Sequence, residues 1–227
     1  MNLWFYIICS FILLLYIYFA YFMLIRIFTN KRYDEKLNIN TRGIRSWGRN
    51  SLYHRTESTP YLALKSFAKE YRFNENDRLV DFGAGKGRVS IYIHNKLNLN
   101  VTGIELNNLT YKDAIKNVNN YLYKYGHCKN VNLSIQLESA ENYKIKKDDN
   151  KFFFFNPFNV VIFEIVIDNI VENAIKNNKE VEIILYYPTK KYVNFLNTNN
   201  NFKLVKQIKT HGSIFPKEKI SIYRFTP

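Results

Sequence analysis

The sequence contains very few of the side chains that form disulfides or bind metal ions. Its 2 cysteines, Cys9 and Cys128, provide neither a disulfide framework nor a C-x-x-C metal motif in a chain of 227 residues. Its 4 histidines are scattered, and neither H-x-x-x-H nor H-E-x-x-H occurs. We therefore expect no disulfide scaffold and no metal site.

Acidic residues are also scarce relative to basic ones. The chain has 19 Asp and Glu against 33 Lys and Arg, a formal net charge of +14. Such a balance favours anionic partners: nucleic acid, phospholipid headgroups or acidic proteins. The lysines are dispersed instead of forming one run, which favours compositional bias together with the basic flank of a membrane anchor. The length fits one domain plus an appendage.

The N-terminal segment from Leu3 to Ile25 lacks any charged residue. These roughly 23 residues are long enough to cross a hydrocarbon core of about 30 Å as a helix. A signal peptide is disfavoured because no basic residue precedes Leu3 and no A-x-A cleavage site follows the run. A buried core helix would rarely be apolar on every face, as this segment is. The sequence therefore predicts a transmembrane helix.

Basic residues follow the apolar run at once, beginning with Arg26, Lys31 and Arg32. The positive-inside rule places this side in the cytoplasm, so we expect a single-pass membrane protein whose soluble domain is cytoplasmic. The basic connector either touches anionic lipid or folds over the soluble domain as a lid. The expected divisions are a transmembrane anchor (1–28), a basic juxtamembrane connector (29–58) and a soluble domain (59–227).

Beyond the connector, helical and strand patterns alternate. Such alternation predicts an α/β fold: a Rossmann-like, doubly wound, mostly parallel sheet of seven strands. The last two strands have no helix between them and are expected to form an antiparallel hairpin. Strands are expected at 78–82, 101–106, 131–137, 151–155, 181–187, 202–208 and 219–225, and helices at 60–71, 86–96, 109–125, 160–176 and 190–196.

A glycine-rich loop, V-D-F-G-A-G-K-G-R, lies between the first expected strand and the helix after it. A P-loop requires Ser or Thr after the lysine, but Gly87 follows Lys86. A dinucleotide loop requires a third glycine at position 88, where Arg88 stands. Both phosphate-binding alternatives are therefore excluded.

The pattern that remains, D-x-G-x-G-x-G, is made by Asp81, Gly83, Gly85 and Gly87. It resembles motif I of the class I methyltransferases, seven-stranded Rossmann-like enzymes that use S-adenosyl-L-methionine. The resemblance implies that these four residues bind this cofactor. A carboxylate at Asp81 suits the ammonium end of the cofactor, directly or through water, whereas it would repel a pyrophosphate.

Three further acidic or polar residues follow later strands. Glu105 ends the second strand about 20 residues beyond the glycines, where a carboxylate accepts both hydroxyls of a ribose. A solvated acid at a strand end is the alternative. In the methyltransferases that the chain resembles, a residue after the next strand contacts the adenine, which implies this role for Glu138 or Ser139. An ordinary loop there remains an equal alternative.

The fourth strand ends in F-F-F-F-N-P-F, and ligands bind at the carboxyl ends of strands in such sheets. The stretch resembles the (D/N)-P-P-(Y/F) motif of amino-group methyltransferases. That resemblance implies catalytic roles for Asn156, Pro157 and Phe158, with the asparagine accepting a hydrogen bond from the target amine. The chain has one proline fewer than the motif, so an adenine or glutamine target does not follow. Alternatively, Pro157 only ends the strand and Phe158 belongs to the core.

The whole pattern resembles bacterial methyltransferase-domain proteins with an N-terminal membrane anchor. We expect a membrane-anchored methyltransferase whose macromolecular acceptor is an amine on a protein. A nucleic-acid base methyltransferase is an alternative, which the anchor disfavours, and an inactive membrane-tethered cofactor-binding module is another. A lipid or quinone-like acceptor is also left open. Tyr53, His54 and Glu57 either assist proton removal or are exposed tail residues.

Overall fold

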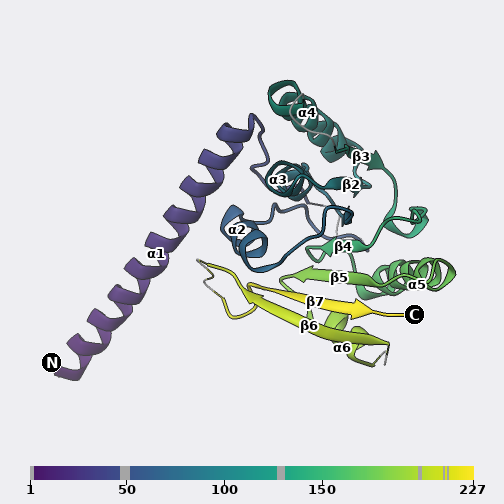
Figure 1. Ribbon diagram of the computed structural model, residues 1–227. Coiled ribbons are helices and arrows are strands. Elements are labelled where there is room, and N and C mark those ends of the chain that lie inside the picture. The colour runs from purple at the N-terminus through teal and green to yellow at the C-terminus, as the bar shows by residue number, and fades with distance from the viewer. Residues whose placement is uncertain (1–2, 47–51, 127–130, 199–200, 212, 214) are drawn as a thin grey trace.

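The computed structural model describes residues 3–46, 52–126, 131–198, 201–211, 213 and 215–227 (Figure 1). Cys128 lies outside these residues. A long helix, α1 (Leu3–Leu37), precedes an α/β domain with helices on both faces of a single sheet.

The sheet has seven strands in the order β3-β2-β1-β4-β5-β7-β6. The first five strands along the chain pair in parallel, and β7 runs antiparallel between β5 and β6. The expected Rossmann-like fold with a C-terminal antiparallel hairpin is therefore confirmed. The strands are β1 (Arg78–Phe82), β2 (Asn100–Glu105), β3 (Leu133–Leu137), β4 (Lys151–Phe154), β5 (Val181–Tyr186), β6 (Phe202–Lys209) and β7 (Lys219–Phe225).

Helices cover the sheet on two sides and create two apolar cores. The helices are α2 (Tyr61–Glu70), α3 (Arg88–Leu97), α4 (Asn108–Tyr125), α5 (Val160–Lys176) and α6 (Lys190–Thr198), with a short 3-10 turn η2 (Ala140–Asn142). One core lies under α2, α3 and α4, and the other under α5 and α6.

The phenylalanine run of β4 shows how a single strand serves both cores. Successive side chains of a strand point to opposite faces. Phe153 accordingly joins the core under α2 and α3, whereas Phe152 and Phe154 join the core under α5. Phe82 of β1 stacks on Phe154 with ring centroids 5.1 Å apart. Because both faces of the central strands are covered, their sequences are apolar without alternation.

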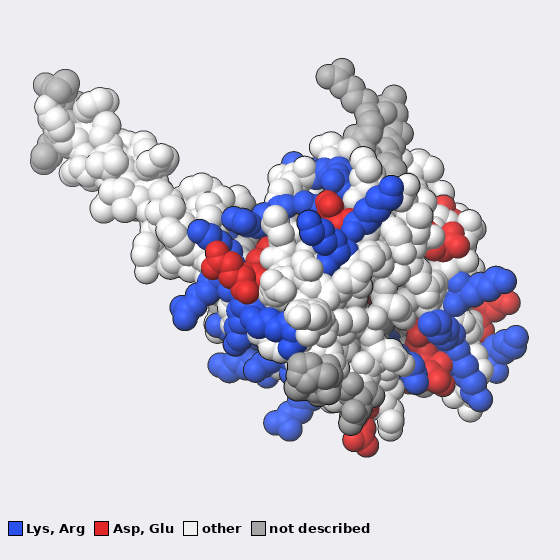
Figure 2. All heavy atoms as spheres, turned by 90° about the horizontal axis from the view of Figure 1, so that it is seen from above, with Lys and Arg blue, Asp and Glu red and all other residues white. Residues whose placement is uncertain are grey.

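Helix α1 is continuous over 35 residues and extends beyond the expected end of the anchor at position 28. Its side chains are exposed from Trp4 to Phe19, and it is long and apolar enough to cross a membrane. Figure 2 shows this part projecting from the domain without charged side chains, while Lys and Arg gather where the helix meets the domain. The first residues of the expected connector are therefore helical.

The C-terminal end of α1 docks on the domain through a buried polar cluster. The Asp34 carboxylate accepts hydrogen bonds from the Tyr61 hydroxyl and the Thr41 amide, both at 2.8 Å. The Arg88 guanidinium lies 3.6 Å from Asp34 and donates to the Thr41 hydroxyl at 2.6 Å. The Tyr33 ring stacks on Tyr61 with centroids 4.8 Å apart. The helix end is therefore fixed to the start of α3.

Removing one partner of this cluster leaves a buried charge without compensation. We expect Asp34→Ala to lower the free energy of unfolding by about 3 kcal/mol, because Arg88 is only 4% exposed. Denaturant unfolding of the whole chain in detergent micelles measures the change. The matched control is Glu35→Ala, which breaks the exposed Lys31–Glu35 pair and is expected to cost less than about 1 kcal/mol. Equal losses in the two variants would contradict a stabilising role for the cluster.

Candidate functional site

The glycine loop begins where β1 ends and continues to the first residue of α3. The expected helix from position 86 starts at Arg88 instead, because residues 83–87 form the turn. Gly83 has a φ of 74°, and a Cβ atom there would lie 2.3 Å from the Cβ atom of Pro157. Its amide and that of Ala84 both donate to the Ile104 carbonyl at 2.9 Å. The loop is thus tied to β2 and lies against the end of β4.

Glu105 ends β2 with its carboxylate directed at the loop. One oxygen accepts from the Gly85 amide at 2.9 Å, and the other accepts from the Asn107 amide at 2.8 Å. Burial raises the pKa of this carboxyl, and the two amide hydrogen bonds oppose that rise. A carboxylate has about four lone-pair sites, so it keeps capacity for further donors such as ribose hydroxyls.

Asp81 lies beneath the loop and not on the wall of the cavity described below. It is 2% exposed, and its carboxyl accepts a hydrogen bond from the Ser90 hydroxyl at 2.7 Å. Burial raises the pKa of Asp81 from an ordinary value of 3.8 to about 7, and the negative charge of Glu105 adds to the rise. A direct contact with the cofactor ammonium stays a prediction.

The residues after β3 border the opposite side of Glu105. The Glu138 amide donates to the Glu105 carbonyl at 3.2 Å, and its carboxylate accepts from the Ser139 amide at 2.9 Å. The Ser139 hydroxyl is buried and has no hydrogen-bond partner in the described part of the chain. An unpaired buried hydroxyl is costly, so a ligand group at this position would satisfy it.

The three residues after the phenylalanine run reach the same region from β4. Asn156 adopts a left-handed conformation with a φ of 45°, and its side-chain oxygen is buried without a partner among the described residues. The Pro157 carbonyl accepts the His54 amide at 2.9 Å. Phe158 is 1% exposed and packs edge-to-face on Phe154, so it belongs to the core as one interpretation expected, although it also borders the cavity.

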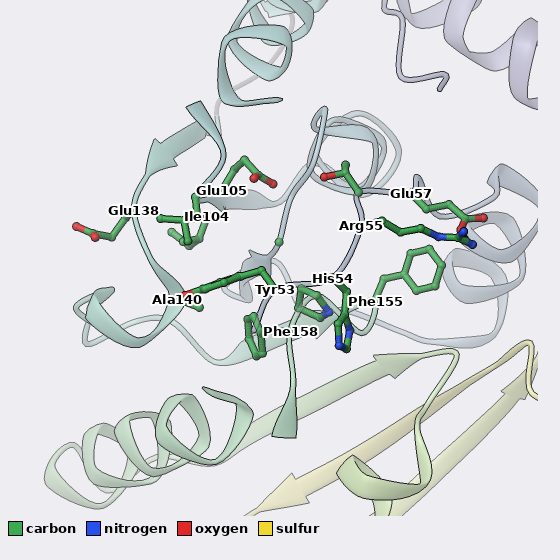
Figure 3. A pocket seen from close by; sticks show the side chains of 14 residues that line it. Tyr53, His54, Arg55, Glu57, Ile104, Glu105, Glu138, Ala140, Phe155 and Phe158 are labelled. Atoms are coloured by element: carbon green, nitrogen blue, oxygen red, sulfur yellow. The ribbon is translucent and has the colours of Figure 1, made fainter. Parts of the chain in front are cut away.

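Residues 52–58, which we call the strap, lie across these elements. The Leu52 carbonyl accepts a hydrogen bond from the Asn159 amide at 2.8 Å. The Thr56 amide donates a hydrogen bond to the Arg45 carbonyl, also at 2.8 Å. The Tyr53 hydroxyl donates to Glu141 at 2.6 Å, which holds the ring across the cavity (Figure 3). No periodic pattern in the sequence signals this segment. A fold over the site was nevertheless one of the two expectations for the basic connector, of which the strap is the last part.

The strap and the strand ends enclose a cavity, the inner cavity, of about 40 Å³. That is room for a few water molecules. The Thr56 methyl group lies against Gly85, where a Cβ atom would be 2.9 Å away. Glu105, Glu138 and the strap residues line the inner cavity, and Glu105 faces it from β2 (Figure 3).

The residues around the inner cavity fit a nucleoside cofactor. With the strap in place, however, a volume of about 40 Å³ does not accommodate one. The glycine loop exposes backbone at the start of a helix, Glu105 retains hydrogen-bonding capacity, and the Ser139 hydroxyl lacks a partner. No group of three or more His, Cys, Asp or Glu side chains among the described residues is arranged to hold a metal ion.

The fold of the chain is similar to that of several solved structures. A proposed tRNA methyltransferase of Streptococcus pneumoniae is 16% identical, with 72% of this chain and 69% of that one covered and a TM-score of 0.52. The chain has the class I methyltransferase fold. Mitomycin 7-O-methyltransferase is 10% identical over 71% of this chain, with a TM-score of 0.51, and the match spans about half of that enzyme, 52%.

A third similar structure is that of an uncharacterized protein from Listeria monocytogenes serotype 4b. It is 10% identical, with 75% of this chain and 68% of that one covered and a TM-score of 0.50. No family model matches the chain, and no curated protein matches it in sequence. At such low identity the likeness establishes the fold, and the roles of the site residues rest on the geometry described above.

The raised pKa of Asp81 makes stability depend on pH. Below pH 7 the native chain holds a proton on Asp81 that the unfolded chain releases above about pH 4. Stability is therefore lost as pH rises, and we expect the free energy of unfolding to fall by about 3 kcal/mol from pH 5 to pH 8 on account of this group. The Asp81→Asn variant is expected to lack this part of the pH dependence of the free energy of unfolding. Denaturant titrations of both proteins across the range measure the difference, and parallel pH profiles would contradict the assignment.

Proposed function

We propose that the chain is an S-adenosylmethionine-dependent methyltransferase anchored in a membrane by α1. The observation that carries the proposal is the unpartnered, buried side-chain oxygen of Asn156, which directly precedes the Pro157 that lies against Gly83, in a methyltransferase fold. The end of β2 thus provides groups suited to a nucleoside. The end of β4 provides a hydrogen-bond acceptor for a donor group on the substrate.

The cofactor would supply a methyl group on a positively charged sulfur, which is already activated for transfer. The task of the chain is then to bind and orient both partners and to exclude water. Glu105 accepts hydrogen bonds from the ribose hydroxyls, and Glu138 or Ser139 contacts the adenine. Asn156 accepts a hydrogen bond from the substrate amine, which aims the nitrogen lone pair at the methyl carbon.

His54 is suited to take the proton that the amine loses. Its Nδ1 lies 2.9 Å from the Asn156 carbonyl oxygen. A carbonyl only accepts hydrogen bonds, so Nδ1 carries the hydrogen and Nε2 of the neutral ring has a free lone pair. His54 borders the inner cavity and is exposed, so a proton can pass from it to solvent.

The apolar, exposed part of α1 supports the membrane anchor, and the basic residues after it support a cytoplasmic location for the domain. Nucleic acid is a second candidate substrate, favoured by the net charge of +14 and by the neighbour proposed to modify tRNA. The anchor weighs against it, because nucleic acid is not concentrated at a membrane. An amine presented at the membrane surface is favoured.

Loss of the ribose-binding carboxylate is expected to weaken cofactor binding. We expect micromolar binding of S-adenosylmethionine to the full chain in detergent micelles, weakened about 10- to 100-fold in Glu105→Gln. Titration calorimetry measures both affinities. The control Glu75→Gln changes an exposed acid outside the site and is expected to bind as the wild type does. A folded wild-type chain that does not bind the cofactor would refute the proposed function.

The role of the Asn156 oxygen is testable with two substitutions that suit its backbone. Glycine tolerates the φ of 45° and removes the oxygen, whereas aspartate retains an acceptor. We expect Asn156→Gly to lower methyl transfer to membrane fractions about 10- to 100-fold with cofactor affinity unchanged. Asn156→Asp is expected to retain more of the transfer. Equal activities in the two variants would contradict the role.

The strap must open before the cofactor can enter the inner cavity. Arg45 and Thr56 face each other in an antiparallel bridge, a spacing compatible with a disulfide. In a chain without its native cysteines, Arg45→Cys combined with Thr56→Cys is expected to bind the cofactor at least about tenfold more weakly when oxidised. Reduction should restore binding, and each single variant serves as a control. Equal affinities of the oxidised and reduced forms would mean that the strap need not move.

A further inference from the structure

A second cavity, the outer cavity, lies between the membrane helix and the catalytic end of the sheet. Its volume is about 860 Å³. Its walls come from α1, the ends of β4 and β5, the strap and the β6–β7 connection. The wall residues that matter here are Phe19, Met23, Arg26, Asn156, Tyr187 and Phe215.

The outer cavity reaches into the apolar part of α1. Phe19, Met23 and Arg26 are spaced by four and three residues, which puts them on one face of the helix. Arg26 is the first charged residue after the apolar run, so it marks the surface of a bilayer that α1 would span. Phe19 lies about 10 Å deeper along the helix axis. The cavity therefore opens at the level where lipid headgroups meet hydrocarbon.

The same cavity reaches the reacting centre at its other end. Asn156 lines it, and its side-chain oxygen is the buried acceptor that has no partner among the described residues. Tyr53, His54 and Phe155 border both the inner and the outer cavity. A molecule entering from the membrane side would thus arrive at the group proposed to orient the nucleophile.

Charges of both signs occur on the wall. Arg26 pairs with Glu218 at 2.6 Å, and Arg55 pairs with Glu57 at 3.2 Å. Two guanidinium groups suit a phosphate, and two carboxylates suit an ammonium group. The aromatic residues Tyr187 and Phe155 on the wall also favour a cation, and the 49% exposed Phe215 suits an acyl chain. This combination matches a zwitterionic headgroup attached to hydrocarbon.

We propose that the methyl acceptor is an amine-bearing zwitterionic phospholipid that enters the outer cavity from the bilayer. The inference rests on the proposed function, because S-adenosylmethionine provides the methyl group. The lipid nitrogen uses its lone pair to form a bond to the methyl carbon as the carbon–sulfur bond breaks. The electron pair of the broken bond remains on sulfur. The proton displaced from nitrogen passes to His54 or to water, and the sulfonium becomes a neutral thioether.

The test uses the full chain reconstituted in vesicles with S-adenosylmethionine labelled in its methyl group. One vesicle type contains phosphatidylethanolamine with phosphatidylcholine, and the other contains only phosphatidylcholine, whose nitrogen is already fully methylated. We expect label in the lipid extract of the first type and none in that of the second. Binding of the cofactor is measured on the same vesicles.

Two tryptophan variants of α1 test the route. Met23→Trp narrows the outer cavity and is expected to lower lipid methylation about tenfold, with cofactor affinity unchanged. Leu24→Trp is the matched control, because Leu24 is 53% exposed and does not line the cavity. It is expected to change the rate less than about twofold. Equal loss in both variants would overturn the assigned route.

The outcomes separate this inference from the proposed function. Cofactor binding without label in the lipid extract, or with label confined to protein, would overturn the lipid acceptor and leave the proposed function intact. No cofactor binding by the folded chain would overturn both. Label in phosphatidylethanolamine that depends on Met23 and not on Leu24 would support the inference.

Discussion

Arg88 begins α3 directly after the last glycine of the loop, and its guanidinium is buried against Asp34 near the end of α1. It also donates to the Thr59 carbonyl at 3.2 Å, just before α2. A buried charge is costly unless it is paired. Separation of these elements would therefore leave the Arg88 guanidinium without its partners, which opposes the separation. The position of α1 and the position of the glycine loop are therefore linked through one side chain.

The strap depends on the same cluster. The Thr41 carbonyl accepts the Ser58 hydroxyl at 2.7 Å, and Thr41 itself is held by Asp34. The strap thus begins and ends on fixed points, at Asn159 on one side and at Thr41 on the other. Between these points it covers the glycine loop and separates the inner from the outer cavity. A single segment consequently borders both the nucleoside side and the acceptor side of the site.

Much of the fold could be predicted because burial imposes simple patterns. The strand at Arg78–Phe82 and the helix at Val160–Lys176 have the expected bounds. The strand is short, largely apolar and followed by the glycine loop, and the helix repeats apolar residues at helical spacing between two asparagines. Helix α1 was predicted too short, because its last residues are polar and are held by contacts of Tyr33 and Asp34 with a distant helix. Tertiary contacts of this kind leave no local pattern.

The candidate site was predictable in its residue types and less so in its geometry. The glycines and Glu105 followed from spacing, and all of them lie at the carboxyl edge of the sheet. The sequence did not reveal that Glu105 accepts hydrogen bonds from two amides of its own chain or that Asp81 faces Ser90. Nor did it indicate the left-handed conformation of Asn156, which depends on packing between the β4 end and the strap.

The unbroken course of α1 has a consequence for kinetics. A helix without a hinge that is fixed to the domain by Asp34 leaves no flexible tether. With α1 across a bilayer, the site would stay at one height above the membrane plane and would turn only as the whole molecule turns. Its encounters with acceptors in the membrane would then be set by lateral diffusion and by the number of acceptors per unit area of membrane. Dilution of the membranes at a constant cofactor concentration would leave the rate per molecule unchanged.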